Sequence, residues 1–189
     1  MGDPGAGPDQ DLSIEKQFEN FLNDFLRGVN TQIKDYKKQR KILAEAIRPV
    51  NLRSPTYVEE NYTLVQQTAP ELRSKMEVLM QTFSRAKEDI ESLLSSQPPE
   101  TRNAILKEWQ KMEEKQVSAY ISFFMIEEDL IVTHEQLMSF YDQTSATFSV
   151  DVSSGEIVFE NVEDEVRNRA FLMTIDRLLE LQQEAVKNQ

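Results

Sequence analysis

Histidine and paired acids are the residues of this sequence that most often perform acid–base chemistry, and their spacing keeps them apart. The sequence contains a single histidine, His134. At the helical spacings of three and four residues, His134 has apolar neighbours, so no carboxylate or metal ligand shares its face. A Glu-x-x-His pair, which di-iron helical bundles need, is also missing. The sequence therefore predicts a structural or surface role for His134.

Adjacent acidic residues recur along the predicted helices. They occur at Glu59-Glu60, Glu113-Glu114 and Glu127-Glu128-Asp129. Neighbouring positions on a helix point in different directions, so we expect solvated surface groups rather than acid–base pairs. The sequence has no glycine-rich phosphate loop and no Gly-x-Ser-x-Gly nucleophile elbow. We therefore expect a protein that is not an enzyme, with no catalytic residue, cofactor or metal ion.

A row of lysines offers a different chemistry, the attraction of anions. The row follows the spacing i, i+3, i+4 and i+7, which places its ammonium groups on one face of a helix. Its members are Lys34, Lys37, Lys38 and Lys41. On one interpretation these lysines pair with acidic helices of the same molecule. On the other they bind an acidic protein partner, with anionic lipid head groups as a weaker alternative.

The charges of the chain are segregated along the sequence. The net charge is −12, but residues 34–53 carry +5, so the rest of the chain carries −17. Eleven acidic residues and no Lys or Arg occur between residues 116 and 166. The net negative charge disfavours binding to naked nucleic acid. The acidic segment at 116–166 favours a basic partner instead.

Apolar residues that recur every three or four positions predict a mainly α protein, an elongated antiparallel bundle or coiled coil of four or five helices. Pro49 and the Ser-Ser-Gln-Pro-Pro segment at 95–99 interrupt the pattern. Thr56 begins one predicted capping box and Thr68 a second, so we expect a break or kink near Thr68. The predicted helices cover approximately residues 12–47, 56–67, 69–95, 100–145 and 162–186.

The helix predicted at 69–95 carries the clearest coiled-coil pattern. Its apolar residues step alternately by four and three positions over three heptads. They are Leu72, Met76, Leu79, Phe83, Ala86, Ile90 and Leu93. Such a seam packs either within the molecule or on a partner helix. On the second interpretation its first four members are predicted partner-binding residues.

The segment before the last predicted helix, residues 148–160, alternates apolar and polar residues with a period of two and predicts a β-hairpin. If its Ser-Gly pair is a two-residue turn, Val152 opposes Ile157 and Val150 opposes Phe159. The four side chains would share one apolar face. An isolated two-stranded hairpin is marginal in water, so we expect this face to cap the bundle end. Addition of a strand from a partner is the alternative.

The last predicted helix has Asn161 as its N-cap, followed by acidic residues that favour a helix start. Its predicted inward residues are Val162, Val166, Phe171, Ile175, Leu178 and Leu181. At the other end of the chain, residues 1–10 have no large apolar residue after Met1 and predict a disordered tail. Residues 11–189 would then form a single helical domain.

The cellular compartment follows from what the sequence lacks. It has no cysteine, so neither a disulfide framework nor a thiolate metal site is expected. It also shows no apolar run of the kind that a signal peptide or a membrane-spanning helix contains. We expect a protein of the cytoplasm or the nucleus.

The order helix, hairpin, helix resembles the layout of the prefoldin chaperones in topology alone, with no sequence motif to match. Heptad spacing, the lack of a catalytic set and the separated charges favour a non-enzymatic scaffold, a helical subunit of a multi-protein complex. Its expected partners are other helical proteins in a hetero-complex, with a homo-oligomer as the alternative. A second hypothesis is an acidic chaperone, or holdase, for basic or unfolded client proteins.

Overall fold

The computed structural model describes residues 13–151 and 153–187. Within these ranges the chain forms four long α-helices and one antiparallel β-hairpin before the last helix, so the predicted mainly α fold is confirmed. The elements are α1 (Ile14–Ala46), the short 3-10 helix η1 (Pro49–Asn51), α2 (Pro55–Leu93), α3 (Pro99–Thr144), β1 (Phe148–Val150), β2 (Ile157–Phe159) and α4 (Val162–Lys187). The predicted disordered tail, residues 1–10, lies outside the described ranges.

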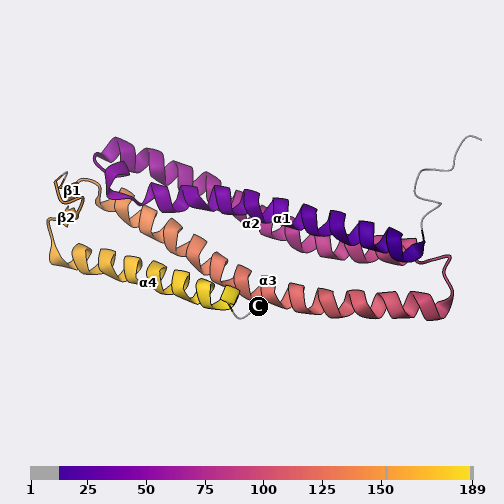
Figure 1. Ribbon diagram of the computed structural model, residues 1–189. Coiled ribbons are helices and arrows are strands. Elements are labelled where there is room, and N and C mark those ends of the chain that lie inside the picture. The colour runs from indigo at the N-terminus through magenta and orange to yellow at the C-terminus, as the bar shows by residue number, and fades with distance from the viewer. Residues whose placement is uncertain (1–12, 152, 188–189) are drawn as a thin grey trace, which may run out of the picture.

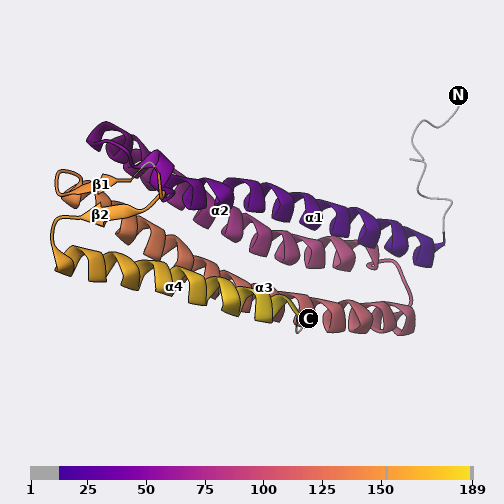
Figure 2. The ribbon, with the colours of Figure 1, turned by 60° about the vertical axis from the view of Figure 1, so that its left-hand side comes forward.

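The helices lie side by side in an elongated antiparallel bundle (Figure 1). α1 packs on α2, α2 on α3, and α3 on α4, and each runs antiparallel to the next. α3 has 46 residues and is therefore about 69 Å long, whereas α4 has 26 and ends beside the middle of α3 (Figure 2). We call the part of the bundle that includes α4 the hairpin half (34–76, 127–151 and 153–187). The other part is the open half (14–33, 77–93 and 99–126).

Short polar side chains determine where two of the helices begin. The Oγ atom of Ser13 accepts a hydrogen bond from the backbone N–H of Lys16 at 3.4 Å and caps α1. Asn161 caps α4 as predicted, because its Oδ1 atom accepts the N–H of Asp164 at 2.7 Å. The three acidic residues of this first turn lie at the positive end of the α4 dipole.

The predicted start of α2 is wrong. The N-cap is Ser54, whose Oγ atom accepts the N–H of Tyr57 at 3.4 Å, and not Thr56. Pro55 takes the first helical position, where a missing N–H costs nothing because that group has no helical acceptor. The Ser-Pro pair therefore starts the helix ahead of the capping box that the sequence suggested.

The predicted break near Thr68 is also wrong, because α2 continues through Pro70 as one helix. Proline inside a helix removes a hydrogen bond and costs roughly 3 kcal/mol or more. However, Ala69 before it and Leu72 after it are both fully buried, and so is Val65 one turn earlier. Burying such side chains on both sides of Pro70 offsets the cost, since each large apolar side chain contributes about 1.5–3 kcal/mol.

The buried side chains are distributed differently in the two halves. One contiguous cluster fills the hairpin half and includes Leu43, Leu52, Val65, Leu72, Leu130, Leu137, Phe140 and Tyr141. The open half has smaller clusters around Trp109 and around Phe83. Trp109 belongs to the core, as predicted, and the rings of Phe21 and Phe25 pack edge-on against it.

The hairpin forms, but its predicted register is wrong by two residues. Phe148 pairs with Phe159 and Val150 with Ile157, so the connecting loop is longer than a two-residue turn. The Asp151 carboxylate closes this loop by accepting the backbone N–H of Ser153 at 2.7 Å. A shift of two residues preserves the face, so Val150, Ile157 and Phe159 still point to the core as predicted.

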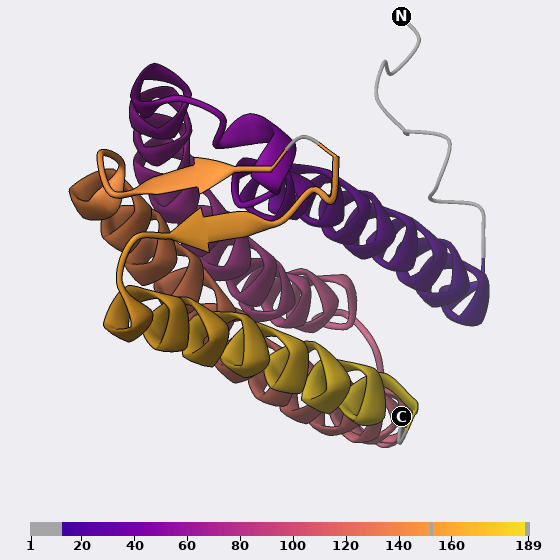
Figure 3. The ribbon, with the colours of Figure 1, turned by 90° about the vertical axis from the view of Figure 1, so that its left-hand side faces the viewer.

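The hairpin lies across the end of the bundle (Figure 3), and its apolar side chains pack against the core. The ring of Phe148 lies 5.8 Å from that of Tyr141, and the ring of Phe159 lies 5.7 Å from that of Phe140. Ser149 and Val158, on the opposite face, are exposed. The hairpin therefore packs on α3 and closes the core, as the capping hypothesis requires.

The inward face predicted for α4 is partly wrong. Ile175 is buried and Phe171 and Leu178 are half-buried against the core, as predicted. Val162, Val166 and Leu181 point outward instead. Because α4 packs along α3, a narrow stripe of its surface is covered, and the remaining apolar residues stay exposed.

Candidate partner-binding surfaces

The first four residues of the predicted coiled-coil seam belong to the chain's own core. Leu72 and Met76 pack in the hairpin half, and Leu79 and Phe83 pack in the open half. All four are buried in the monomer. The heptad therefore joins α2 to its own neighbours, and the protein does not present these side chains to a partner.

The predicted lysine face lies on the exposed side of α1. Lys34, Lys37, Lys38 and Lys41 are all exposed. Within residues 13–151 and 153–187, none of the four forms an ion pair. The interpretation that these lysines pair with acidic helices of the same molecule gains no support, and the face remains available to an anionic partner.

The predicted hairpin residues do not form a free surface. Val150, Ile157 and Phe159 are half-buried against the helical core. Val152, the fourth residue of that set, lies outside the described residues. What the hairpin offers to a partner is its outer face, where Val158 is exposed, and its strand edges.

An exposed apolar surface lies on α4, although three of its four residues were predicted to point inward. Four apolar side chains are spaced by four, seven and eight residues, which keeps them on one side of the helix. They are Val162, Val166, Met173 and Leu181, with exposed fractions of 73%, 59%, 66% and 40%. We call these four residues the outer α4 face. It is the side of α4 that points away from α3.

Acidic side chains flank the outer α4 face. Glu163, Glu180 and Glu184 are exposed, and no ion pair in the described part of the chain involves them. By contrast, Arg169 is already paired with Glu165 within the helix at 2.9 Å. Arg177 on the same side is also exposed and forms no ion pair in the described part of the chain, so the free charges beside this apolar stripe are mainly but not wholly negative, which complements a basic partner.

A buried carboxylate that the sequence reasoning missed connects three helices. Glu127 of α3 is 1% exposed, although we expected it on the solvated surface. Its carboxylate accepts hydrogen bonds from the Tyr36 hydroxyl at 2.5 Å, from Arg40 Nε at 3.1 Å and from the Gln182 amide. Burial and the neighbouring Glu127 carboxylate raise the pKa of Tyr36 above its usual range. These bonds fix α1 and α4 to the middle of α3.

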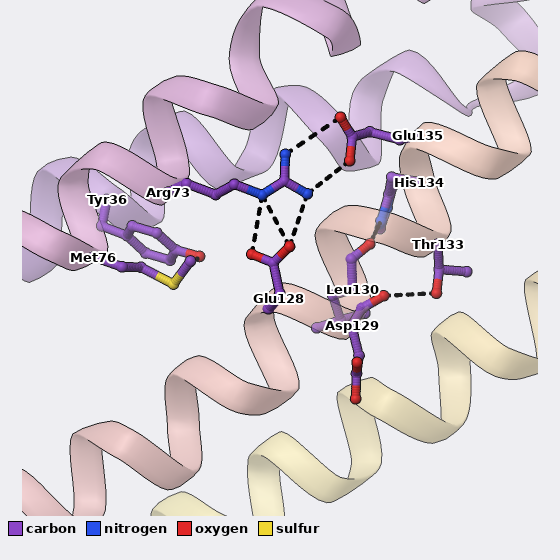
Figure 4. A network of polar contacts seen from close by, with 9 residues as sticks. All are labelled: Tyr36, Arg73, Met76, Glu128, Asp129, Leu130, Thr133, His134 and Glu135. Atoms are coloured by element: carbon purple, nitrogen blue, oxygen red, sulfur yellow. Dashed lines mark hydrogen bonds and ion pairs between the residues drawn. The ribbon is translucent and has the colours of Figure 1, made fainter.

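A second charged cluster joins α2 to α3 at the surface (Figure 4). Arg73 extends its guanidinium between Glu128 and Glu135, at 2.8 Å from each. Its hydrogen bonds to Glu135 and Glu128 raise the pKa of Arg73. The forked geometry of arginine favours this double pairing, which fixes the register between the two helices.

The histidine that could have served in catalysis lies in the core. His134 is buried, and its Nδ1 atom is hydrogen-bonded to the Leu130 carbonyl at 2.7 Å (Figure 4). Burial lowers the pKa of His134 to about 4, so the ring is neutral at physiological pH. In residues 13–151 and 153–187, no three His, Asp or Glu side chains group as a metal site requires. Among the helices described, none is long and apolar enough to cross a membrane.

Comparison with known proteins gives no match for this chain: no family model, no curated protein and no solved structure matches it. The chain is an elongated helical bundle closed by a hairpin, and any function must be argued from its surfaces.

Proposed function

We propose that this protein is a non-enzymatic assembly subunit that binds a helix of another protein along the outer α4 face. The partner helix would bury Val162, Val166 and Met173 under its own apolar stripe. Basic residues beside that stripe would pair with the free acids of α4. The lysine face of α1 would serve as a second contact, for an acidic segment of the same complex.

The exposure of four large apolar side chains on one side of α4 supports this proposal most directly. Single exposed apolar residues are normal, but a row along a helix is how one amphipathic helix recognises another. The row also continues along the length of the helix rather than gathering at one point. A partner helix in antiparallel or parallel contact could therefore cover it from end to end.

Free carboxylates favour a different protein over a second copy of the chain as the partner. Two copies meeting through this face would bring the unpaired Glu163, Glu180 and Glu184 of each copy to the same interface. Each copy also carries a net charge of −12, which opposes self-association. A basic partner helix neutralises the same groups, so we propose a hetero-complex.

Substitution of the outer α4 face tests the proposal. The triple variant Val162→Ser, Val166→Ser, Met173→Ser removes apolar contact area without adding charge. We expect the purified partner, identified by photo-crosslinking from position 173, to bind it at least about tenfold more weakly, since buried apolar side chains contribute on the order of 1 kcal/mol each. The matched control is Val78→Ser, an exposed valine of α2 in the open half. Equal binding by both variants would contradict the proposal.

The contribution of the acidic residues that flank the outer α4 face is measured separately. Replacing Glu163, Glu180 and Glu184 by Gln should slow association at low ionic strength and make binding less dependent on salt. Sedimentation equilibrium of the protein alone gives the third result. A stable dimer that the serine substitutions dissociate would replace the hetero-complex by a homo-oligomer.

The chaperone hypothesis uses the same apolar and acidic groups and is the second candidate. A holdase would suppress aggregation of many basic or unfolded clients, with weak and strongly salt-dependent binding. An assembly subunit would bind a defined folded partner and leave aggregation of such clients unchanged. We propose that the protein itself is located in the cytoplasm or the nucleus. Fractionation of cells would test this location.

A further inference from the structure

A cavity lies between α1, α2 and α3 at the junction of the two halves. It has a volume of about 160 Å³. Its walls come from residues far apart in the sequence, around positions 33, 79 and 123. An apolar cavity of similar size, roughly 150 Å³, is large enough to hold a benzene ring in another protein. The space therefore fits a small ring rather than a peptide side chain with its backbone.

Aromatic side chains form much of the cavity wall. Tyr36 of α1 lies 6.4 Å from Phe123 and 6.3 Å from Phe124, measured between ring centroids. Tyr120 continues the row, 6.0 Å from Phe124. All four rings line the cavity. At these separations the rings contact one another and form one aromatic wall, against which a further aromatic ring can pack edge-on or offset.

Two ammonium groups make the lining of the cavity positively charged. Lys37 of α1 and Lys75 of α2 both line it, and no acidic residue does. Within the described ranges the ammonium group of neither lysine forms an ion pair or a hydrogen bond. The hydroxyl of Tyr120 also has no hydrogen-bond partner there, although burial raises the pKa of this side chain. Two ammonium groups and one hydroxyl thus border an apolar space, and the Gln32 amide that also lines it is hydrogen-bonded to Thr82.

We propose that this cavity binds a small aromatic carboxylate, with its ring against the aromatic side chains and its carboxylate at Lys37 and Lys75. Apolar walls with a few convergent polar groups are typical of small-molecule sites. A cationic ligand is disfavoured because two lysines would repel it, even though aromatic rings can attract cations. The site goes beyond the proposed function and does not depend on the outer α4 face.

Three ligands of the same shape and different charge test the site. They are phenylacetate, phenylacetamide and phenylethylammonium, titrated at millimolar concentrations while the methyl signals of Ile33 and Leu79 are followed by NMR. Both residues line the cavity. We expect phenylacetate to bind at least about tenfold more tightly than the neutral amide, because hydrogen bonds to charged groups are the stronger ones. The cation should cause no shift. Absent shifts with phenylacetate, or equal affinity for the acid and the amide, would overturn the proposal.

Matched lysine variants separate the site from general attraction to the lysine face. The double variant Lys37→Gln, Lys75→Gln should weaken phenylacetate binding by more than about tenfold. The control Lys34→Gln, Lys38→Gln removes the same charge from exposed neighbours that do not line the cavity, and we expect a change below about twofold. Equal losses in both double variants would mean that the lysines act through their summed charge, and the site would be rejected.

Filling the cavity gives an independent result. The variant Ile33→Phe adds ring volume to the wall and should abolish binding of phenylacetate while circular dichroism remains that of the parent protein. If it does not fold, Lys37→Gln with Lys75→Gln still decides, because both positions are partly or fully solvent-exposed. Undiminished binding in a folded Ile33→Phe protein would place the ligand elsewhere and overturn the proposal.

Discussion

The hairpin half and the open half are built on the same three helices, yet α3 is buried to different extents in the two. In the hairpin half α2 covers one side of α3 and α4 covers another, so that even Glu127, Thr133 and His134 are buried. In the open half, among the residues described, Trp109 is the one side chain of α3 that is buried, and Ile121 and Met125 are exposed. A fourth helix and a hairpin thus convert a narrow seam into an enclosed core.

The two halves also differ in whether their buried polar groups have hydrogen-bond partners. In the hairpin half the buried Glu127 and His134 both have hydrogen-bond partners. In the open half Trp109 Nε1 is buried without one, among the side chains the structure describes. A buried N–H without an acceptor costs on the order of 1–3 kcal/mol. We infer that the hairpin half is the more stable one and test this by substitutions in both.

The largest expected effect is that of removing a ring from the hairpin half. Phe140 is fully buried and contacts the rings of Phe159 and Phe171, so it joins α3 to the hairpin and to α4. Phe140→Ala should lower the free energy of unfolding by about 4 kcal/mol, measured by urea denaturation. Phe25→Ala in the open half is the matched control and should cost about half as much, because Phe25 is half-buried. Equal losses would remove the difference between the halves.

The next effect concerns the buried charge pair. Arg40→Met leaves Glu127 without its cation and should cost about 3 kcal/mol, since an uncompensated buried charge is strongly destabilising. The double variant Arg40→Met, Glu127→Leu removes both charges and should be more stable than the single variant, as for other buried ion pairs replaced by apolar residues. Denaturation of the two variants side by side is the measurement.

If the double variant is instead the less stable one, Glu127 contributes chiefly through its neutral donors, the Tyr36 hydroxyl and the Gln182 amide. The stability of the hairpin half would then depend on hydrogen bonds between α1, α3 and α4 rather than on charge. Gln182→Leu distinguishes the two cases, because it removes the α4 donor and leaves Arg40 in place.

Much of the fold was predictable because it depends on local periodicity. The extent of α1 and the heptad of α2 follow from spacing, and so does the face of the hairpin. The inward position of Glu127 was also visible, since it continues the steps of three and four from Phe123 to Leu130. We gave more weight to its acidic neighbours, Glu128 and Asp129, and therefore expected solvent exposure.

Other features depend on which element packs on which, and spacing does not contain that information. α2 continues through Pro70 because the side chains around it are buried by α1 and α3. Val162 and Val166 stay exposed because α4 has one neighbouring helix, although their apolar character suits a buried face equally well. The lysine row could be located from sequence, but its lack of ion pairs required the positions of the acidic helices.

A smaller effect depends on pH and reports on the hairpin half. The pKa of His134 is about 4 in the folded protein against about 6.5 in the unfolded chain, so the unfolded chain binds the proton more readily. Its contribution to stability is therefore present above pH 6.5 and is lost as the pH falls toward 4. Between pH 7 and pH 5 we expect a loss of about 2 kcal/mol, measured by denaturation at each pH.

His134→Asn provides the matched control for this titration. Asparagine has a donor near the position of Nδ1, so it can still bind the Leu130 carbonyl, and it does not titrate. The difference between the two pH profiles removes the contribution of the surface carboxylates. A parent profile as flat as that of the variant would show that water reaches His134. The core of the hairpin half would then not be enclosed, and the contrast between the two halves would fail.

The smallest effect comes from the two described glycines, one in each half. Gly155 in the hairpin loop has a φ of +72°, a conformation that costs an L-residue roughly 1 kcal/mol, so Gly155→Ala should lower stability by about that amount. Gly28 lies within the α1 helix of the open half, and alanine is the better helix former there by about 0.5–1 kcal/mol. A Cβ atom meets nothing within 4 Å at either site, so the backbone alone decides the sign. We expect opposite shifts in the midpoint of thermal unfolding. If Gly155→Ala were neutral, the hairpin loop could relax without loss of packing, and the closure of the hairpin half would depend on the rings of Phe148 and Phe159 rather than on the turn.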